Sequence, residues 1–252
     1  MALIQTDNKV TVNKIERVRT GIKGLDDLLS GGLPKESITL VSGPPGSGKS
    51  IFCYQFIAKG IEDGEKCLYL TLDKKIEGLL LQAKEIGINF NEAIEKGQVK
   101  FMFLNINKKL IYETMTNEIL SGNYNRIVLD SITPLSEMPI YINNPEFISE
   151  VDNIDHEEIS SGNFPVRRLH LHYIINALET ARCTALVTSE LPSGSTNYSR
   201  DGLSEFLADG VIILSLDPTM DRRKLAVMKM RSTKHTLKPQ NMEIGKGGIQ
   251  LV

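Results

Sequence analysis

The chain has 252 residues, of which 41% are hydrophobic, and 29 basic against 31 acidic side chains give it a formal net charge of −2. This is enough apolar material for one α/β domain or two small ones, and no linker-like change of composition divides the chain. The balanced charge argues against nucleic acid as the default partner, and no apolar run approaches the roughly 20 residues that span a membrane.

The cysteines and the N-terminus indicate where the protein works. Cys53, Cys67 and Cys183 lie far apart inside apolar segments, which is typical of buried free thiols in a reducing compartment. The first residues lack the charged and then apolar layout of a signal peptide. We therefore expect a cytoplasmic protein.

Apolar strands alternate with amphipathic helices along the chain. The predicted strands cover residues 37–43, 66–72, 99–105, 126–133 (ending at Asp130) and 184–190, and the predicted helices cover 49–64, 76–87, 110–122 and 166–183. Two later runs, 210–216 and 224–233, are joined by a turn-like sequence and predict a hairpin. The expected fold is α/β, a wound and mostly parallel β-sheet flanked by helices, with the C-terminal antiparallel hairpin at its edge.

A glycine-rich loop joins the first predicted strand to the first helix. Its residues, Gly43, Pro44, Pro45, Gly46, Ser47, Gly48, Lys49 and Ser50, match the pattern G-x-x-x-x-G-K-[ST]. Glycines let backbone N–H groups turn inward around phosphates, and the following helix adds its positive N-terminal end. Lys49 supplies a charge for the β and γ phosphates, and the Ser50 hydroxyl is placed to ligate magnesium. The context predicts nucleotide binding, and we include Ile51 in the predicted site.

Asp130 ends the apolar strand that begins at residue 126. A carboxylate at the carboxyl edge of a parallel sheet can hold magnesium through water. The alternative is an aspartate that caps the following turn. With a phosphate loop upstream, the magnesium role is favoured.

Residues 137–165 break the alternation, with seven acidic side chains and no lysine or arginine. The simplest interpretation is a solvated surface excursion. The other is an element that docks a protein partner or closes as a lid, because long loops in compact domains are often functional. Its charge would repel a phosphate backbone in either case.

From GIKGLDDLLSGG through the phosphate loop, the chain resembles the KaiC-like ATPases of the RecA superfamily. The resemblance continues through EKCLYLTL, RIVLDSIT, TALVTSE, EFLADGVIIL and VMKMRSTKH, and covers nearly everything outside the N-terminal tail and the acidic excursion. It implies a RecA-like P-loop NTPase domain over residues 19–252, preceded by a tail over 1–18. It also implies ATP and Mg²⁺ as ligands.

The resemblance further implies a homo-oligomer, expected to be a hexameric ring, that holds ATP between neighbours. Residues matching Lys229 and Arg231 would reach the γ-phosphate of the next subunit, where their charge acts only on assembly. Alternation along a strand puts both side chains on one face. A basic, solvated edge strand is the alternative. His235, in the same stretch, either flanks the nucleotide or is a plain surface histidine.

The chain departs from the family pattern after the second predicted strand. Where the family usually carries two consecutive glutamates, one of which positions the attacking water, this chain has Asp73 and Lys74. Asp73 is one methylene shorter, and Lys74 is free to face away if the backbone is extended there. Loss of a well-placed base costs about 10²–10⁴-fold in rate, so we predict slow hydrolysis rather than none.

Glu190 stands where relatives place a polar residue that senses the γ-phosphate. It is either the catalytic base in place of Asp73 or simply a turn residue. The polar segment after it, 191–202, predicts a mobile loop. Loops here and after Asp130 touch DNA in DNA-handling members of the superfamily, but one is acidic in this chain and the other holds a single arginine, Arg200. The main hypothesis is therefore a slow ATPase; a non-catalytic ATP-binding switch and a recombination or repair accessory ATPase are the alternatives.

Overall fold

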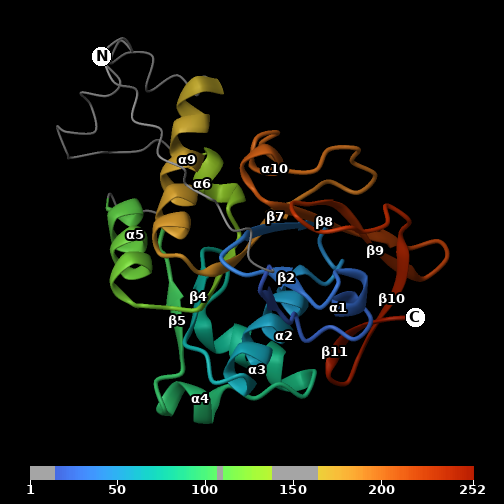
Figure 1. Ribbon diagram of the computed structural model, residues 1–252, viewed down its shortest axis with the longest axis horizontal. Coiled ribbons are helices and arrows are strands. Elements are labelled where there is room, and N and C mark those ends of the chain that lie inside the picture. The colour runs from blue at the N-terminus through green and yellow to red at the C-terminus, as the bar shows by residue number, and fades with distance from the viewer. Residues whose placement is uncertain (1–14, 107–109, 138–163) are drawn as a thin grey trace, which may run out of the picture.

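The computed structural model describes residues 15–106, 110–137 and 164–252 (Figure 1). Most of the predicted tail, and all but the two ends of the acidic excursion, lie outside the described residues. The partner-docking and lid interpretations of that excursion stay predictions.

A nine-stranded sheet forms the centre of the described structure, in the order β11-β10-β9-β8-β3-β7-β6-β4-β5. The strands are β3 (Ile38–Gly43), β4 (Cys67–Thr71), β5 (Val99–Phe103), β6 (Arg126–Asp130), β7 (Thr184–Glu190), β8 (Gly210–Asp217), β9 (Arg222–Met230), β10 (Gln240–Gly245) and β11 (Gly248–Leu251). Strands β3 to β8 are parallel, and β9, β10 and β11 are antiparallel. The predicted wound sheet with an antiparallel C-terminal hairpin is confirmed, although β10 and β11 extend the sheet beyond that hairpin.

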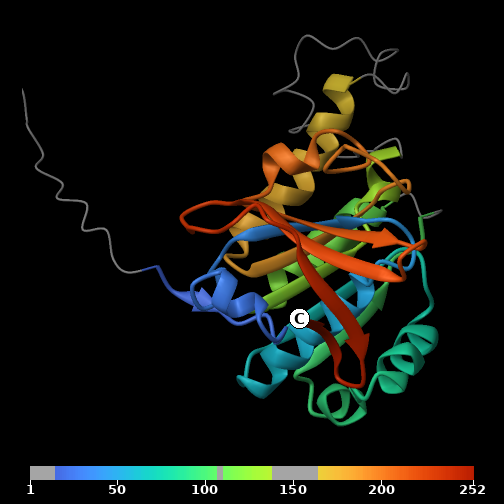
Figure 2. The same cartoon turned by 90° about the vertical axis from the view of Figure 1, so that its right-hand side faces the viewer.

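Helices cover both faces of the sheet (Figures 1 and 2). One face carries α1 (Leu25–Leu28), α2 (Lys49–Glu62), α3 (Ile76–Glu85) and α4 (Asn91–Glu95), and the other carries α5 (Ile111–Ser121), α6 (Thr133–Glu137) and α9 (Phe164–Thr180). The short α10 (Ser204–Leu207) precedes β8, and a two-stranded ribbon pairs β1 (Arg17–Val18) with β2 (Leu33–Pro34). In the described part of the chain, no helix combines the length and the apolar character that crossing a membrane requires.

Two hydrophobic cores lie on the two faces of the sheet. In β3, Val41 packs into the core under α2, whereas its neighbour Leu40 packs into the core under α5 and α9. In β6, Val128 and Ile127 divide in the same way. Successive side chains of a strand point to opposite faces, so strands covered on both sides read as continuous apolar runs.

Parallel pairing brings the carboxyl ends of four strands together. Gly43 at the end of β3 is in register with Glu190 on β7, and Thr71 at the end of β4 is in register with Asp130 on β6. The loops that follow these strands therefore leave the sheet at one edge. Ligands of open α/β sheets bind at this edge.

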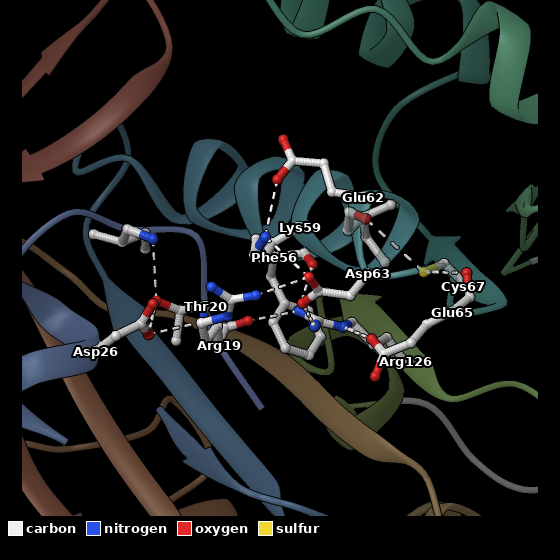
Figure 3. Close-up of polar contacts among 12 residues, drawn as sticks. Arg19, Thr20, Asp26, Phe56, Lys59, Glu62, Asp63, Glu65, Cys67 and Arg126 are labelled. Atoms are coloured by element: carbon white, nitrogen blue, oxygen red, sulfur yellow. Dashed lines mark hydrogen bonds and ion pairs between the residues drawn. The ribbon is translucent and has the colours of Figure 1, made fainter. Parts of the chain in front are cut away.

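Arg126, the first residue of β6, lies at the amino end of its strand, where it connects several elements of the fold (Figure 3). Its side chain is 1% exposed and donates to the backbone oxygens of Arg19 (2.7 Å) and Phe56 (2.9 Å). It also pairs with Asp63 at 3.4 Å and with Glu65. A buried guanidinium needs such partners, and these link β6, the end of α2 and the N-terminal segment.

Candidate nucleotide-binding site

The glycine-rich loop turns from β3 into α2 through backbone positions that other residues would strain. Gly48, immediately before α2, has φ +107°, a conformation that L side chains rarely adopt. At Gly43, an added Cβ atom would lie 2.5 Å from the carbonyl oxygen of Leu214. The two glycines therefore allow the loop to pass tightly over the neighbouring strand β8.

The N-terminus of α2 points its backbone N–H groups into this loop. The first N–H groups of a helix have no intrahelical partner. Among the described residues, no side chain caps the start of this 14-residue helix. The dipole adds partial positive charge at the same point. Together these features suit an anionic ligand such as phosphate.

The side chain of Lys49, the predicted phosphate ligand, lies along the glycine-rich loop. Its Nζ atom donates to the carbonyl oxygens of Gly43 (2.8 Å) and Pro44 (3.2 Å). Burial lowers the pKa of Lys49, and the carboxylates of Glu190 and Asp130 partly oppose that shift. Charged phosphate oxygens would be stronger acceptors for Lys49 than these carbonyls.

Asp130 accepts hydrogen bonds from three hydroxyl groups. Ser50 Oγ (2.9 Å) and the Tyr69 hydroxyl (2.7 Å) donate to Oδ2, and Thr188 Oγ1 (2.5 Å) donates to Oδ1. Burial, and then the charge of Asp130, raises the pKa of Tyr69, which keeps its hydroxyl a neutral donor. The two predicted magnesium ligands, Ser50 and Asp130, are therefore in direct contact. These three donors come from α2, β4 and β7, which gives the turn-capping alternative no support.

The two candidate bases, Asp73 and Glu190, lie on either side of this contact. Asp73 Oδ2 accepts from Ser131 Oγ at 3.3 Å, and the backbone N–H of Glu190 donates to Thr133 Oγ1 at 3.0 Å. Burial raises the pKa of Asp73, and the charges of Glu190 and Asp130 raise it further. The three carboxylates thus concentrate negative charge in this part of the structure.

These groups line one cleft of about 550 Å³ at the carboxyl edge of the sheet. Its lining consists of Pro45, Gly46, Gly48, Lys49, Ser50, Ile51, Thr71, Asp73, Lys74, Gln82, Asp130, Glu190, Arg223 and Ile244. Of the predicted loop residues, Gly43, Pro44 and Ser47 are buried and do not line the cleft in the described structure. The volume is in the range of small-molecule sites.

Lys74 lines this cleft and does not face away from it. The chain bends after β4: the Oγ1 atom of Thr71 lies 3.4 Å from both the backbone nitrogen and the carbonyl oxygen of Lys74. The Lys74 ammonium donates to Gln82 Oε1 at 3.1 Å. Alternation of side chains holds only for extended backbone, so it does not apply to this turn.

Two further cleft residues come from the antiparallel edge of the sheet and were not predicted. Arg223 on β9 donates from Nε to the carbonyl oxygen of Gly46 at 3.4 Å, and so lies over the phosphate loop. The Cδ1 atom of Ile244 on β10 lies 3.0 Å from where a Cβ atom on Gly48 would stand. No local motif marks either residue. Both lie near the loop only because the sheet places β9 and β10 on that side of β3.

Lys229, Arg231 and His235 do not line the cleft of their own chain, as far as the described residues show. Lys229 Nζ donates to backbone oxygens at the end of α10, at 3.0 Å for Glu205 and 2.5 Å for Ala208. Arg231, one residue after β9, forms an ion pair with Asp209 at 2.9 Å. His235 is half-buried, and its Nε2 atom has no partner within the described structure.

Comparisons with known proteins find similar chains along most of this sequence. The family model described as "ATPase: KaiC" matches residues 18–252. A UPF0273 protein of Methanopyrus kandleri is 29% identical over 94% of this chain and 92% of its own length. Another, from Methanocaldococcus jannaschii, is 30% identical over 93% of this chain and 96% of its own length. The circadian clock protein KaiC3 of Synechocystis is 29% identical over 88% of this chain but only 42% of its own length. The crystal structure of a KaiC-like protein from Pyrococcus horikoshii matches with a TM-score of 0.76 and 28% identity, covering 95% of this chain and 100% of that one.

Proposed function

The chain belongs to the KaiC family of ATPases within the RecA superfamily, and from this premise we propose that it is a slow, magnesium-dependent ATPase that holds its nucleotide between the subunits of a homo-oligomer. The observation that carries the proposal is the contact between Ser50 and Asp130 at the uncapped N-terminus of α2. Asp73 and Glu190 line the same cleft.

The phosphates of ATP would lie in the loop between Gly46 and Ser50. Backbone N–H groups at the start of α2 and the Lys49 ammonium would bind them there. Ile51 lines the cleft immediately after the loop. These interactions recognise a phosphate chain, and the choice of adenine rests on family membership.

The residues present fit a magnesium ion that arrives with its nucleotide. Ser50 Oγ and Asp130 Oδ2 are two oxygen atoms of the kind that ligate magnesium, and they lie only 2.9 Å apart. Mg²⁺ is usually bound by one or two protein oxygens together with water and phosphate. Within the described residues, no group of three or more His, Cys, Asp and Glu side chains could hold a metal alone. When bound, the metal neutralises the charge that develops on the phosphoryl oxygens.

Hydrolysis requires a carboxylate that orients a water molecule towards the γ-phosphorus. The water oxygen bonds to phosphorus, the bond to the bridging oxygen of ADP breaks, and the proton of the water passes to the carboxylate. Asp73 and Glu190 are the two candidates, and both line the cleft. The short side chain of Asp73 and the adjacent Lys74 are the reasons to expect slow turnover.

The proposal needs a neighbouring subunit because Lys229 and Arg231 lie outside the cleft of their own chain, in the part that the structure describes. Both are held near α10, by backbone oxygens and by Asp209. A cation that enters the site only on assembly couples hydrolysis to the oligomer. We expect a hexameric ring.

A mixing experiment tests the proposal. Lys49→Ala should abolish phosphate release, and Arg231→Ala should reduce it about 10²-fold or more. A mixture of the two variants should recover activity, because an intact loop from one subunit then meets an intact arginine from another. Lys234→Ala, at an exposed lysine of the same stretch, should leave activity unchanged. Full activity of Arg231→Ala alone would contradict the proposal.

One observation favours a second candidate, a nucleotide switch that binds ATP without hydrolysing it. Lys74 occupies the cleft where the family places a glutamate. The same assay separates the two functions. Binding of Mg-ATP with phosphate release no faster than in buffer would favour the switch.

A further inference from the structure

We propose that Lys74 binds the terminal phosphate of the nucleotide from within the same subunit, so that the cleft distinguishes a nucleoside triphosphate from a diphosphate. This inference rests on the proposed function, since it requires a nucleotide in the cleft. It assigns a positive role to the residue that replaces a glutamate of the family pattern.

The first support is how the Lys74 side chain is held. Its Nζ atom donates to Gln82 Oε1 at 3.1 Å, and the same oxygen accepts the hydroxyl of Tyr54 at 3.1 Å. Tyr54 is fully buried in α2, the helix that follows the phosphate loop. Gln82 is thereby oriented by α2, and both Gln82 and Lys74 line the cleft.

The second support is that this acceptor is neutral. Within the described residues, the side-chain ammonium group of Lys49 donates to loop carbonyls and that of Lys74 to an amide oxygen, whereas Lys59 and Lys96 each pair with a carboxylate. Among the ion pairs of the described residues, none involves Lys74. Asp73 is the neighbouring carboxylate that the charge of Lys74 acts on, but it does not hold the ammonium group in an ion pair, so an anion can replace the amide as a stronger acceptor.

The third support is position along the sheet. The order β3-β7-β6-β4 places Asp130 between the phosphate loop and the turn with Lys74, so the turn lies beyond Asp130 as seen from the loop. A triphosphate that starts in the loop and shares magnesium with Ser50 and Asp130 has its terminal phosphate nearest that turn. A diphosphate is one phosphate shorter and does not extend as far.

Charge explains why a lysine is useful at this point. Asp73, Asp130 and Glu190 all line the cleft, and a terminal phosphate beside Asp73 would add negative charge to a site that already concentrates it. A cation on the adjacent residue offsets that repulsion. Hydrolysis is then slow because Asp73 is a poorly placed base, and the unhydrolysed nucleotide is bound more tightly because Lys74 holds its terminal phosphate.

Calorimetric titration of the full chain with Mg²⁺ and either a non-hydrolysable ATP analogue or ADP tests the inference. Lys74→Met should weaken binding of the analogue about tenfold and change binding of ADP by less than about twofold. Lys74→Arg should retain most of the preference because it keeps the charge. Lys75→Met is the matched control, since Lys75 is the adjacent exposed lysine and does not line the cleft in the described structure.

The outcomes separate this inference from the proposed function. Equal loss of analogue and ADP binding in Lys74→Met, or no loss of either, would overturn the role of Lys74 while leaving nucleotide binding intact. A wild-type protein that binds neither nucleotide would overturn both. Thermal melting of each variant, with Lys74→Gln as a second neutral substitution, checks that lost binding does not reflect unfolding.

Discussion

At the scale of single residues, the protonation state of Asp73 should control the rate of hydrolysis. Burial raises its pKa, and the nearby carboxylates of Glu190 and Asp130 add to the shift. A carboxyl group accepts a proton from water only when it is ionised. Below its pKa Asp73 is protonated, so kcat/KM, which reports the free enzyme, should fall as pH decreases, and it should do so at a higher pH than for an ordinary aspartate. Phosphate release at Mg-ATP concentrations well below KM, between about pH 4 and pH 8, measures this.

Substitution identifies which carboxylate is responsible. Asp73→Asn should lower kcat about 10²-fold and remove the acidic decrease, because the amide cannot accept the proton. Glu190→Gln is the matched control, since Glu190 lines the same cleft. If the acidic decrease survives in Asp73→Asn and disappears in Glu190→Gln, the base is Glu190.

At the scale of elements, the hairpin of β10 and β11 is fastened to the helix that follows the phosphate loop. Gln55 on α2 donates from Nε2 to the carbonyl oxygen of Ile249 (3.0 Å) and accepts from its N–H (2.7 Å). An added Cβ atom on Gly248 would lie 2.4 Å from Gln55. The C-terminal hairpin therefore holds Ile244 in its place beside Gly48.

Removal of this amide should affect both stability and the site. Gln55→Leu leaves a buried N–H and a buried carbonyl unpaired, which should lower the free energy of unfolding by about 2–4 kcal/mol. Nucleotide affinity should fall with it, since Ile244 lines the cleft. Urea unfolding and calorimetry measure the two effects. Gln240→Leu, at a more exposed glutamine at the start of β10, should change neither by much; equal effects would refute the argument.

The buried Arg126 makes a different contact between elements, at the start of β6 (Figure 3). Arg126→Ala should lower the free energy of unfolding by about 3–4 kcal/mol, because two carboxylates and two backbone oxygens lose their donor and a cavity opens. Arg182 also pairs with a glutamate, but its side chain is 77% exposed, so Arg182→Ala should cost less than about 1 kcal/mol. Chemical denaturation compares the two. A similar small loss in both would show that burial of Arg126 adds nothing.

The elements that could be predicted from the sequence are those with a regular pattern of burial along their length. Strands β3, β6 and β7 are covered on both faces and therefore read as apolar runs. The pattern of β10 is weaker, because Met242 is its one fully buried side chain. Its place is set by contacts with β9 and, through β11, with α2. Those contacts depend on the order of the strands, which periodicity does not encode.

The same distinction applies to the candidate site. Gly46 to Ser50 follow a local motif, and Asp130, Asp73 and Glu190 follow strand ends that parallel pairing must bring to one edge. Arg223 and Ile244 come from antiparallel strands across the sheet, so their approach to the loop follows from tertiary structure. The position of Lys74 in the cleft depends on a bend after β4, which the sequence does not mark, so the possibility that Lys74 faces away rested on an extended backbone.

At the scale of the whole molecule, one subunit holds an incomplete set of the proposed catalytic groups. The phosphate loop lies at the carboxyl edge of the parallel strands, whereas Lys229 and Arg231 lie beside α10. Phe206, in α10, is 67% exposed, and its carbonyl oxygen accepts from Lys229 Nζ at 3.4 Å. Phe206 is an exposed aromatic side chain on the short helix whose backbone oxygens hold Lys229, and exposed aromatic residues are enriched at interfaces.

We therefore expect Phe206 to be buried when subunits assemble. Phe206→Ser should weaken self-association in Mg-ATP at least tenfold, because burial of an aromatic ring contributes strongly to an interface. Sedimentation velocity over a range of concentrations measures this, and phosphate release should fall in parallel as Arg231 is withdrawn from the neighbouring site. Leu120→Ser is the control, because Leu120 is 47% exposed on α5, which Figure 1 shows on a different side of the molecule from α10. An unchanged assembly in Phe206→Ser, or dissociation caused by Leu120→Ser, would move the interface away from α10 and remove the support for a nucleotide site shared between subunits.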